Sequence, residues 1–302
     1  MTENREERSG FFRSALSFNG SASKKILFPL LVFFSYSVCI TIIHNFFFPL
    51  PKFDLTPFEI CGAFLGILLV FRTNAGYERW WEARKLWGGI VNQSRNLAIA
   101  SMSYVPQRNS LLKKFLLLIV RFPFATKDIL RANPAFRTCN IQNVSPAVLI
   151  SWEMANILSA WKKQALISPM AFFTLDVERK KLIDYLGACE RILKTPMPLA
   201  YAIKTRRFLF IFLLLVPVGI VFDAGWSTPF ITLLVAYPLL GLDQIGKELQ
   251  NPFSKNNLSH LPLDNICKTI EKDVLALSIL KEKGEKTIKE HDLLSEQHIS
   301  HS

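Results

Sequence analysis

Residues 208–242 read FLFIFLLLVPVGIVFDAGWSTPFITLLVAYPLLGL and contain a single charged residue, Asp223. One helix of that length would measure about 52 Å, whereas the hydrocarbon layer of a membrane is about 30 Å thick. The segment Asp223-Ala-Gly-Trp-Ser-Thr-Pro229 in its middle has the composition of a turn. We therefore predict a helical hairpin whose two arms, residues 208–222 and 226–242, each cross a membrane.

Two earlier segments are also apolar. Residues 26–51 carry no charge, and a membrane-spanning helix needs about 20 apolar residues. A secretory signal peptide is the alternative, but the run is too long for one and no small-residue cleavage pattern follows it. Residues 60–71, ICGAFLGILLVF, are fewer, so they fit a buried core helix as easily as a span.

The distribution of cationic residues favours four spans over three. Lys and Arg number five before residue 26, 22 in residues 72–207 and eight in residues 243–302, whereas the two short connections share only Lys52. With four spans, 35 of the 36 cations lie on one side of the membrane. Cationic residues near the ends of spans stay in the cytoplasm. We therefore predict a multi-pass membrane protein with both termini in the cytoplasm.

The region between the second and third spans is strongly basic. It carries 22 basic and eight acidic residues, and its apolar residues recur at helical spacing. Nucleic acid could explain a net charge of +14, but no nucleic-acid-binding motif is present, so anionic lipid headgroups or a permeating anion are simpler explanations. We predict an all-α membrane protein made of a cytosolic segment 1–25, spans within 26–71 and 208–242, a helical cytosolic domain 72–207, a cytosolic segment 243–280 and a disordered tail 281–302.

Catalytic and cofactor-binding motifs are absent from the sequence. It contains no phosphate-binding loop, no dinucleotide-binding glycine motif, no nucleophile elbow and no HExxH zinc motif. Its five cysteines form no CxxC pair, which argues against a structural zinc site and against a disulfide framework. We therefore predict that the protein is not an enzyme and holds no metal or cofactor.

Residues 71–98, FRTNAGYERWWEARKLWGGIVNQSRNLA, contain four arginines and three tryptophans directly after the short apolar helix. Composition alone favours an amphipathic helix at the membrane surface, with arginine stems packed on aromatic rings. The order of these residues, however, resembles the signature of the bestrophin family, and two later segments, Gly187–Arg191 and Asn251–Phe253, match as well. The signature residues are Arg72, Asn74, Tyr77, Arg79, Trp80, Glu82, Arg84, Trp87 and Arg95.

The resemblance covers residues 15–280 and implies a bacterial-type homopentameric ion channel in the inner membrane. It implies four spans per subunit, with the second span, residues 57–71 here, lining a central pore. A large helical cytosolic domain would extend that pore, and Met170 aligns with a constriction in it. A core or solvent-exposed methionine remains the alternative for Met170.

The helix that the resemblance assigns to the pore has two distinct faces. Gly62 and Gly66 form a small-residue face suited to packing on another helix. Ala63, Ile67 and Phe71, at i, i+4 and i+8, lie on the adjacent face, and the resemblance aligns them with the hydrophobic neck of the family. Apolar rings can close a pore by dewetting. The residues by themselves fit packing positions as well.

The sequence carries fewer signals for the ion that would permeate the channel and for the stimulus that would open it. Calcium-gated relatives carry an acidic run after the Asn-Pro-Phe motif, but residues 254–259 here, SKNNLS, provide no carboxylate for calcium, so we predict that calcium does not gate the channel. The basic cytosolic domain favours anions such as chloride. Asp54 and Glu59 precede the pore helix and would favour cations such as sodium. A membrane-anchored binding protein and a secondary transporter are alternatives, although transporters usually show internal repeats and intramembrane charges.

Overall fold

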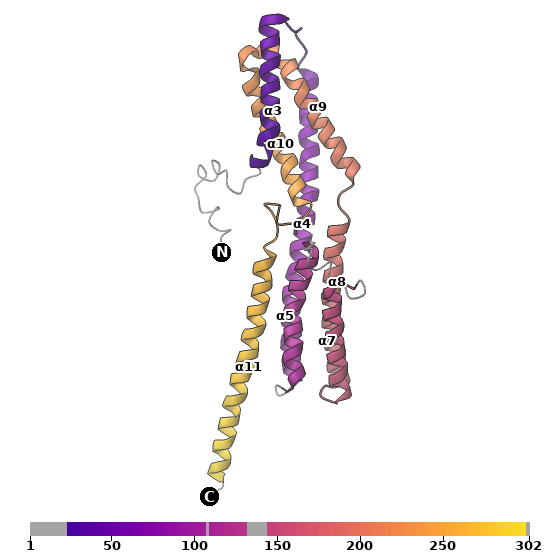
Figure 1. The fold of residues 1–302 in the computed structure, drawn as a ribbon, viewed down its shortest axis with the longest axis vertical. Helices are drawn as coiled ribbons and strands as arrows, with labels where there is room; N and C mark the ends of the chain where they lie inside the picture. Colours follow the sequence, from indigo (N-terminus) through magenta and orange to yellow (C-terminus); the bar gives the residue numbers. More distant parts are fainter. Residues whose placement is uncertain (1–22, 107–108, 132–143, 300–302) are drawn as a thin grey trace. The chain divides into compact units, whose positions relative to one another are not determined.

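The computed structural model is helical, and the residues that it describes contain no β-strand (Figure 1). This confirms the predicted all-α fold class. Residues 23–106, 109–131 and 144–299 are described, so most of the predicted N-terminal segment and Cys139 lie outside. The chain divides into two compact units, each described by itself: unit 1 comprises residues 1–81 and 195–260, and unit 2 comprises residues 82–194 and 261–302.

Unit 1 holds the apolar helices. They are α3 (Ser23–Ile42), the first part of α4 (Thr56–Tyr104), α9 (Leu199–Ala224) and α10 (Thr228–Leu249). The two helical arms of the predicted hairpin are present, since the short turn η3 (Gly225–Ser227) joins α9 to α10, whereas their crossing of a membrane stays a prediction. Gly225 ends α9 with φ +50°, a conformation that is strained for residues with a Cβ atom.

Three helical stretches of the described chain are long and apolar enough to cross a membrane. They are residues 24–47, the helix 56–104, and residues 200–249, which include both arms of the hairpin. The short apolar run at residues 60–71 is not a separate helix. It belongs to α4, which continues without a break because no proline occurs between Pro57 and Pro106.

Helix α3 packs against α9 and α10, which lie beside it in Figure 1. The polar side chains of this core are hydrogen-bonded: Ser37 and Thr232 hydroxyls lie 3.1 Å apart, and Thr41 donates to the Ser37 carbonyl at 2.9 Å. Such bonds let hydroxyl groups sit between apolar helices. The apolar core consists of Phe33, Leu65, Leu69, Leu209, Phe212, Leu213, Val216 and Ala236.

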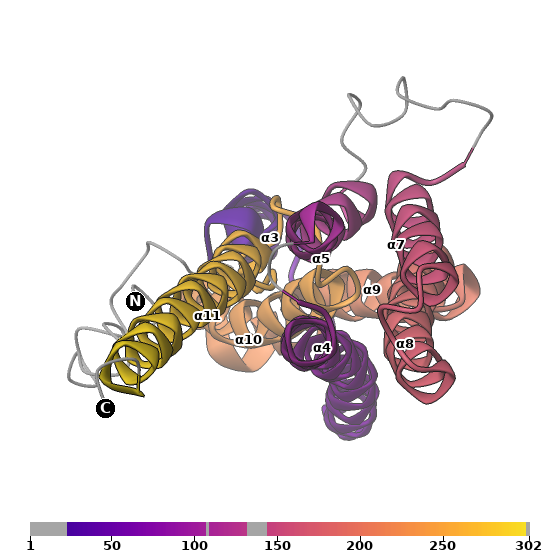
Figure 2. The same cartoon turned by 90° about the horizontal axis from the view of Figure 1, so that it is seen from below.

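Unit 2 is a bundle formed by the second part of α4 with α5 (Ser110–Leu130), α7 (Pro146–Lys163), α8 (Pro169–Lys194) and α11 (Leu263–Ile299). Helix α7 packs between α5 and α8, and α11 packs on α5 (Figure 2). Large aromatic side chains fill its centre; the rings of Phe115 and Trp161 lie 5.0 Å apart and both residues are fully buried. This core is what the helical spacing of apolar residues predicts.

Ion pairs attach the start of α11 to α5. The Asp264 carboxylate accepts hydrogen bonds from Lys127 at 3.0 Å and from Arg131 at 2.7 Å. Burial raises the pKa of Asp264, but the bonds to these two cations outweigh that effect and hold the pKa well below its usual range. The carboxylate is therefore ionised at neutral pH, and the attachment persists there.

The predicted disorder of residues 281–302 is wrong for residues 281–299, which continue α11 to Ile299. Their sequence is rich in Lys, Glu and Leu, which are strong helix formers. It also places Glu282 and Glu285 four residues before Lys286 and Lys289, a spacing that stabilises helices. Residues 300–302 lie outside the described residues.

The division into units does not test the predicted membrane boundaries, which stay predictions. Unit 1 extends past the apolar runs, to Trp81 on α4, back to Thr195 before α9 and on to His260 after α10. The physical reason is that α4 does not end at Phe71, so polar residues beyond that point still pack on α9, α10 and the segments that flank them.

Candidate pore helix and the contacts that position it

The predicted neck residues lie on the side of α4 that faces away from the rest of unit 1. Ile67 and Phe71 are 53% and 63% exposed, and Ala63 is exposed too. Leu65 and Leu69 lie roughly opposite Ile67, at about 100° per residue, and are fully buried in the core of unit 1. Packing within the chain therefore does not explain the three neck positions, and they are available to a pore or to another subunit.

One of the two glycines on the small-residue face of α4 lies against another helix. A Cβ atom on Gly62 would lie 3.1 Å from Cζ of Phe212, so the glycine permits the close approach of α9. A Cβ atom on Gly66 would meet no atom within 4 Å. Gly62 thus lies against a neighbouring helix, and Gly66 faces open space in the single subunit.

An ionic cluster lies directly beside Phe71. The Arg72 side chain, 1% exposed, pairs with the carboxylate of Asp243 on α10, and Arg206 of α9 reaches the same carboxylate at 3.1 Å. Close by, a Cβ atom on Gly76 would lie 3.0 Å from Cβ of Leu249, so α4 and α10 can approach closely only because residue 76 is glycine. The cluster ties three helices of unit 1 together at the end of the predicted neck.

Two signature residues of α4 bond to backbone outside the helices of unit 1. Arg79 donates to the Thr195 carbonyl at 2.9 Å and to the Gln250 carbonyl at 3.4 Å. Trp80 donates to the Ser259 carbonyl at 2.7 Å, and its ring stacks on Tyr77 with 6.2 Å between ring centres. These bonds fix the segments before α9 and after α10 to α4. Asn74, one turn beyond Phe71, is exposed.

Three signature residues position helices of unit 2. Trp87 is fully buried. Glu82 pairs with Arg191 of α8 at 3.2 Å, and the guanidinium of Arg95 donates to Asp273 of α11 at 2.8 and 2.5 Å. The signature thus consists largely of residues that join α4 to other helices.

Two predicted residues of unit 2 are exposed. Met170, near the start of α8, is 73% exposed, so it is not a core methionine of the subunit. Arg84 is exposed on α4, with a guanidinium nitrogen 3.6 Å from the position that a Cβ atom on Gly88 would take. Neither position contributes to packing within the bundle.

The charged residues of the two short connections, 51–59 and 223–229, are partly engaged. Asp54 accepts hydrogen bonds from the Thr56 amide at 3.0 Å and from its hydroxyl at 2.9 Å, and these bonds lower the pKa of the Asp54 carboxyl. Glu59 is exposed in the first turn of α4. Lys52 pairs with Asp223 at 2.9 Å. The one cation of these connections is thereby neutralised, and Asp54 and Glu59 leave them acidic.

Sequence reasoning missed the partners that hold this helix in place. Asp243 is the partner of Arg72, and Lys25 of α3 pairs with the nearly buried Glu248 of α10 at 3.1 Å. A signal was present, because Arg72 directly follows one apolar run and Asp243 directly follows another. Charges at the ends of two adjacent spans can lower their free energy by pairing.

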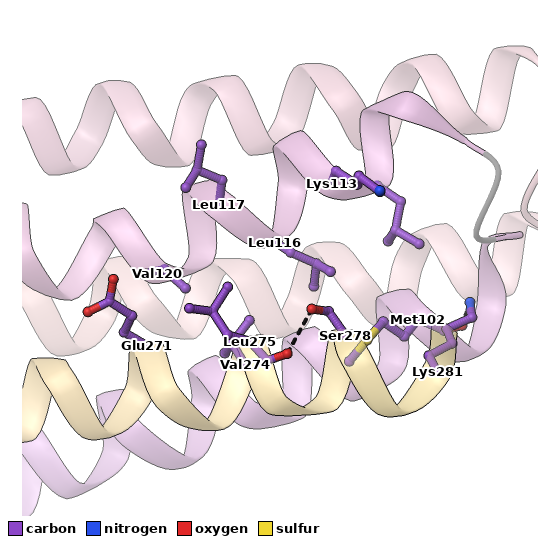
Figure 3. Close-up of a pocket in the computed structure, with 11 residues that line it drawn as sticks. Met102, Lys113, Leu116, Leu117, Val120, Glu271, Val274, Leu275, Ser278 and Lys281 are labelled. Carbon is purple, nitrogen blue, oxygen red and sulfur yellow. Dashed lines mark hydrogen bonds between the residues drawn. The ribbon is translucent and has the colours of Figure 1, made fainter. Parts of the chain in front are cut away.

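A groove of about 420 Å³ lies between α5 and α11 in unit 2 (Figure 3). Lys113 and Lys281 stand at one end of it and Glu271 at the other. Lys281 also donates to the carbonyl of Val105 at 2.9 Å, at the end of α4. The apolar lining consists of Met102, Leu112, Leu116, Leu117, Val120, Val274 and Leu275.

The described part of the chain offers no candidate metal site, and two of its four described cysteines, Cys189 and Cys267, are buried. It contains no group of three His, Cys, Asp or Glu side chains able to hold a metal ion. Burial raises the pKa of both Cys189 and Cys267 to about 12, so these thiols stay protonated.

Comparison with known proteins identifies the family. The family described as Bacterial/Fungal Bestrophin protein matches residues 3–276. The chain is 34% identical over 288 residues to Voltage-dependent anion channel-forming protein mll4386 of Mesorhizobium japonicum, covering 92% of this chain and 91% of that one. It is 34% identical over 280 residues to the protein of the same description, YneE, of Escherichia coli K12, covering 89% and 91%.

The fold agrees with a solved structure of the same kind. A crystal structure of a bacterial bestrophin homologue from Klebsiella pneumoniae superposes with a TM-score of 0.77 at 27% identity, covering 84% of this chain and 98% of that one. The relatives are named as channels and not as enzymes, in agreement with the absence of catalytic motifs. The match spans most of the sequence and includes all of the signature residues, so the chain belongs to the bestrophin family.

Proposed function

We propose that the chain forms a homopentameric channel in which α4 of each subunit faces a central pore. The observation that carries the proposal is the exposed apolar stripe of α4, whose opposite side is buried in the subunit. Five copies would place Ala63, Ile67 and Phe71 in three stacked rings. Such a neck conducts ions passively and closes when water leaves it.

The topology we propose has four spans, in α3, the first part of α4, α9 and α10. Three apolar stretches, one of which is the two-armed hairpin, and the one-sided cations support it. Both termini would then lie in the cytoplasm of a bacterium, with the protein in the inner membrane. Exposed apolar residues such as Phe28, Phe230 and Leu234 would contact lipid. Met170, exposed on α8, would form the cytosolic constriction.

We propose that the channel passes monovalent anions, chloride in particular. The support is the name of its relatives, which are described as anion channel-forming proteins, together with the net positive charge of residues 72–207. A monovalent cation channel of the same architecture is the second candidate, because Asp54 and Glu59 leave the outer connections acidic once Lys52 has paired with Asp223.

The reversal potential under a steep KCl gradient tests this proposal. We expect purified protein in a planar bilayer to reverse near the chloride equilibrium potential, and the value should change little when sodium replaces potassium. Reversal near the cation equilibrium potential would establish the second candidate instead. A monomeric particle in detergent, with no current, would contradict both and favour a membrane-anchored binding protein.

We propose that calcium does not gate this channel. The Lys25 ammonium connects the end of α10 to the loop after it, since it pairs with Glu248 at 3.1 Å and donates to the Asn256 carbonyl at 3.0 Å. Gln244 donates to the same Glu248 oxygen at 2.9 Å. The only carboxylate of this cluster is therefore neutralised by the chain itself, and residues 254–259 add none.

We expect the current to stay flat between a calcium-chelated solution and millimolar calcium. The measurement is the macroscopic current of one reconstituted membrane during perfusion of both faces, with magnesium as the control for divalent screening. Steep activation by calcium without activation by magnesium would contradict the prediction.

A further inference from the structure

Glu78 lies on the same side of α4 as the proposed neck, and it is neither a signature residue nor one of the acidic residues that precede the pore helix. At about 100° per residue, Glu78 lies roughly 20° from Ile67 around the helix axis. Leu69 and Gly76, both buried, lie on roughly the opposite side. All of these residues belong to unit 1. Glu78 therefore points away from the rest of unit 1 in nearly the same direction as Ile67.

The Glu78 side chain is exposed, and the described part of the chain provides no hydrogen bond or ion pair to its carboxylate. Two other glutamates differ from Glu78 in this respect: Glu82 pairs with Arg191, and Glu248 pairs with Lys25. The adjacent guanidinium of Arg79 is directed to backbone carbonyls. Among the described residues, then, no ion pair offsets the negative charge of Glu78.

The distance between Glu78 and the neck is no longer than the screening length of a dilute salt solution. Seven residues separate Glu78 from Phe71, which corresponds to about 10 Å along the helix. The screening length is also about 10 Å at 0.1 M salt, about 30 Å at 0.01 M and about 3 Å at 1 M. A charge at this position acts on an ion in the neck in dilute salt and is screened from it in concentrated salt.

We infer that Glu78 is a selectivity-determining residue, which rests on the channel proposed above. In the pentamer it forms a ring of five carboxylates on the cytoplasmic side of the neck. The ring attracts cations to the neck and repels anions from it, so it opposes the basic cytosolic domain and lowers the ratio of chloride to potassium permeability.

Neutralisation of this ring is the test. We expect Glu78→Gln to raise the chloride-to-potassium permeability ratio roughly tenfold in about 0.01 M KCl and far less in about 1 M KCl. A factor of roughly ten is the low end of the change in local ion concentration that a charged constriction produces. Glu78→Lys should shift the ratio further in the same direction, and Glu78→Asp should keep the wild-type value. Glu153→Gln is the matched control, since it removes the same charge from α7, where Glu153 pairs with Lys114 at 3.4 Å.

The outcomes separate this inference from the channel proposal. Because Glu78 is exposed and makes no hydrogen bond or ion pair among the described residues, its variants should elute as the wild-type oligomer does in size-exclusion chromatography. A permeability ratio unchanged by Glu78→Gln and Glu78→Lys in dilute salt, in protein that conducts, would overturn the inference and leave the channel intact. No current from the wild type or from the neck variant Ile67→Ala/Phe71→Ala would overturn both.

Discussion

The double variant Ile67→Ala/Phe71→Ala is expected to carry at least about tenfold more current than the wild type, which corresponds to a barrier lowered by about 1.4 kcal/mol or more. The side chains removed are the two largest of the proposed neck, and both are exposed on the side of α4 that faces away from the subunit. Smaller rings let the neck hold water, and a wetted neck conducts. Macroscopic current and single-channel open probability in planar bilayers measure the effect.

A matched control separates pore opening from loss of packing. Leu234 of α10 is 75% exposed in unit 1, so Leu234→Ala removes a comparable exposed apolar side chain that the proposal assigns to the lipid surface. We expect it to leave the current unchanged. Equal effects of the two variants, or no effect of the double variant on well-folded oligomers, would place the neck elsewhere.

The variant Asp243→Asn is expected to destabilise the protein by about 3–5 kcal/mol, since it removes the carboxylate that neutralises a buried guanidinium. Arg72 is 1% exposed, so water cannot replace the lost partner. The variant loses the ion pairs that hold α4, α9 and α10 together next to Phe71. Thermal unfolding of the detergent-solubilised protein, followed by size-exclusion chromatography after heating, measures it.

The partner Arg206 supplies the control for this prediction. Its side chain is 44% exposed, and exposed ion pairs contribute about 0–1 kcal/mol. Arg206→Gln should therefore lower the stability far less than Asp243→Asn does. In the double variant Arg72→Met/Asp243→Asn, the buried charge is gone, and the cost should be smaller than the sum of the two single variants. Equal losses of stability in Arg206→Gln and Asp243→Asn would show that the buried Arg72–Asp243 pair stabilises the protein no more than the exposed Arg206–Asp243 pair does.

Much of the fold could be predicted from the sequence. The hairpin was readable because an apolar run of 35 residues is too long for one span and contains a turn at Asp223–Pro229. The apolar positions in residues 72–207 recur at helical spacing, which predicts the buried core of unit 2. Hydropathy could not predict that α4 is 49 residues long, because its polar second part is stabilised by contacts with other helices and not by its own composition.

The sequence predicted the candidate site only where the spacing of residues along a helix was enough to place them on one side. Ala63, Ile67 and Phe71 share one side of a helix by spacing alone, and the resemblance to bestrophins gave that side a role. The sequence could not say whether this side is buried, since a packed face and a pore-lining face have the same period. It also could not say which charges are paired: Lys52, Lys25 and Arg72 have partners in the structure, whereas the carboxylate of Glu78 has no partner among the described residues.

By itself the sequence determined the all-α membrane class, the hairpin, the clustering of cations outside the apolar runs and the family, because these properties depend on the order and composition of residues along the chain. Only the tertiary structure decided that Arg72 is buried against Asp243, that Lys25 neutralises Glu248 and that Glu78 and the residues proposed for the neck are exposed. These properties depend on which side of each helix meets another helix. That choice is made by contacts between residues more than 100 positions apart, which no local pattern records.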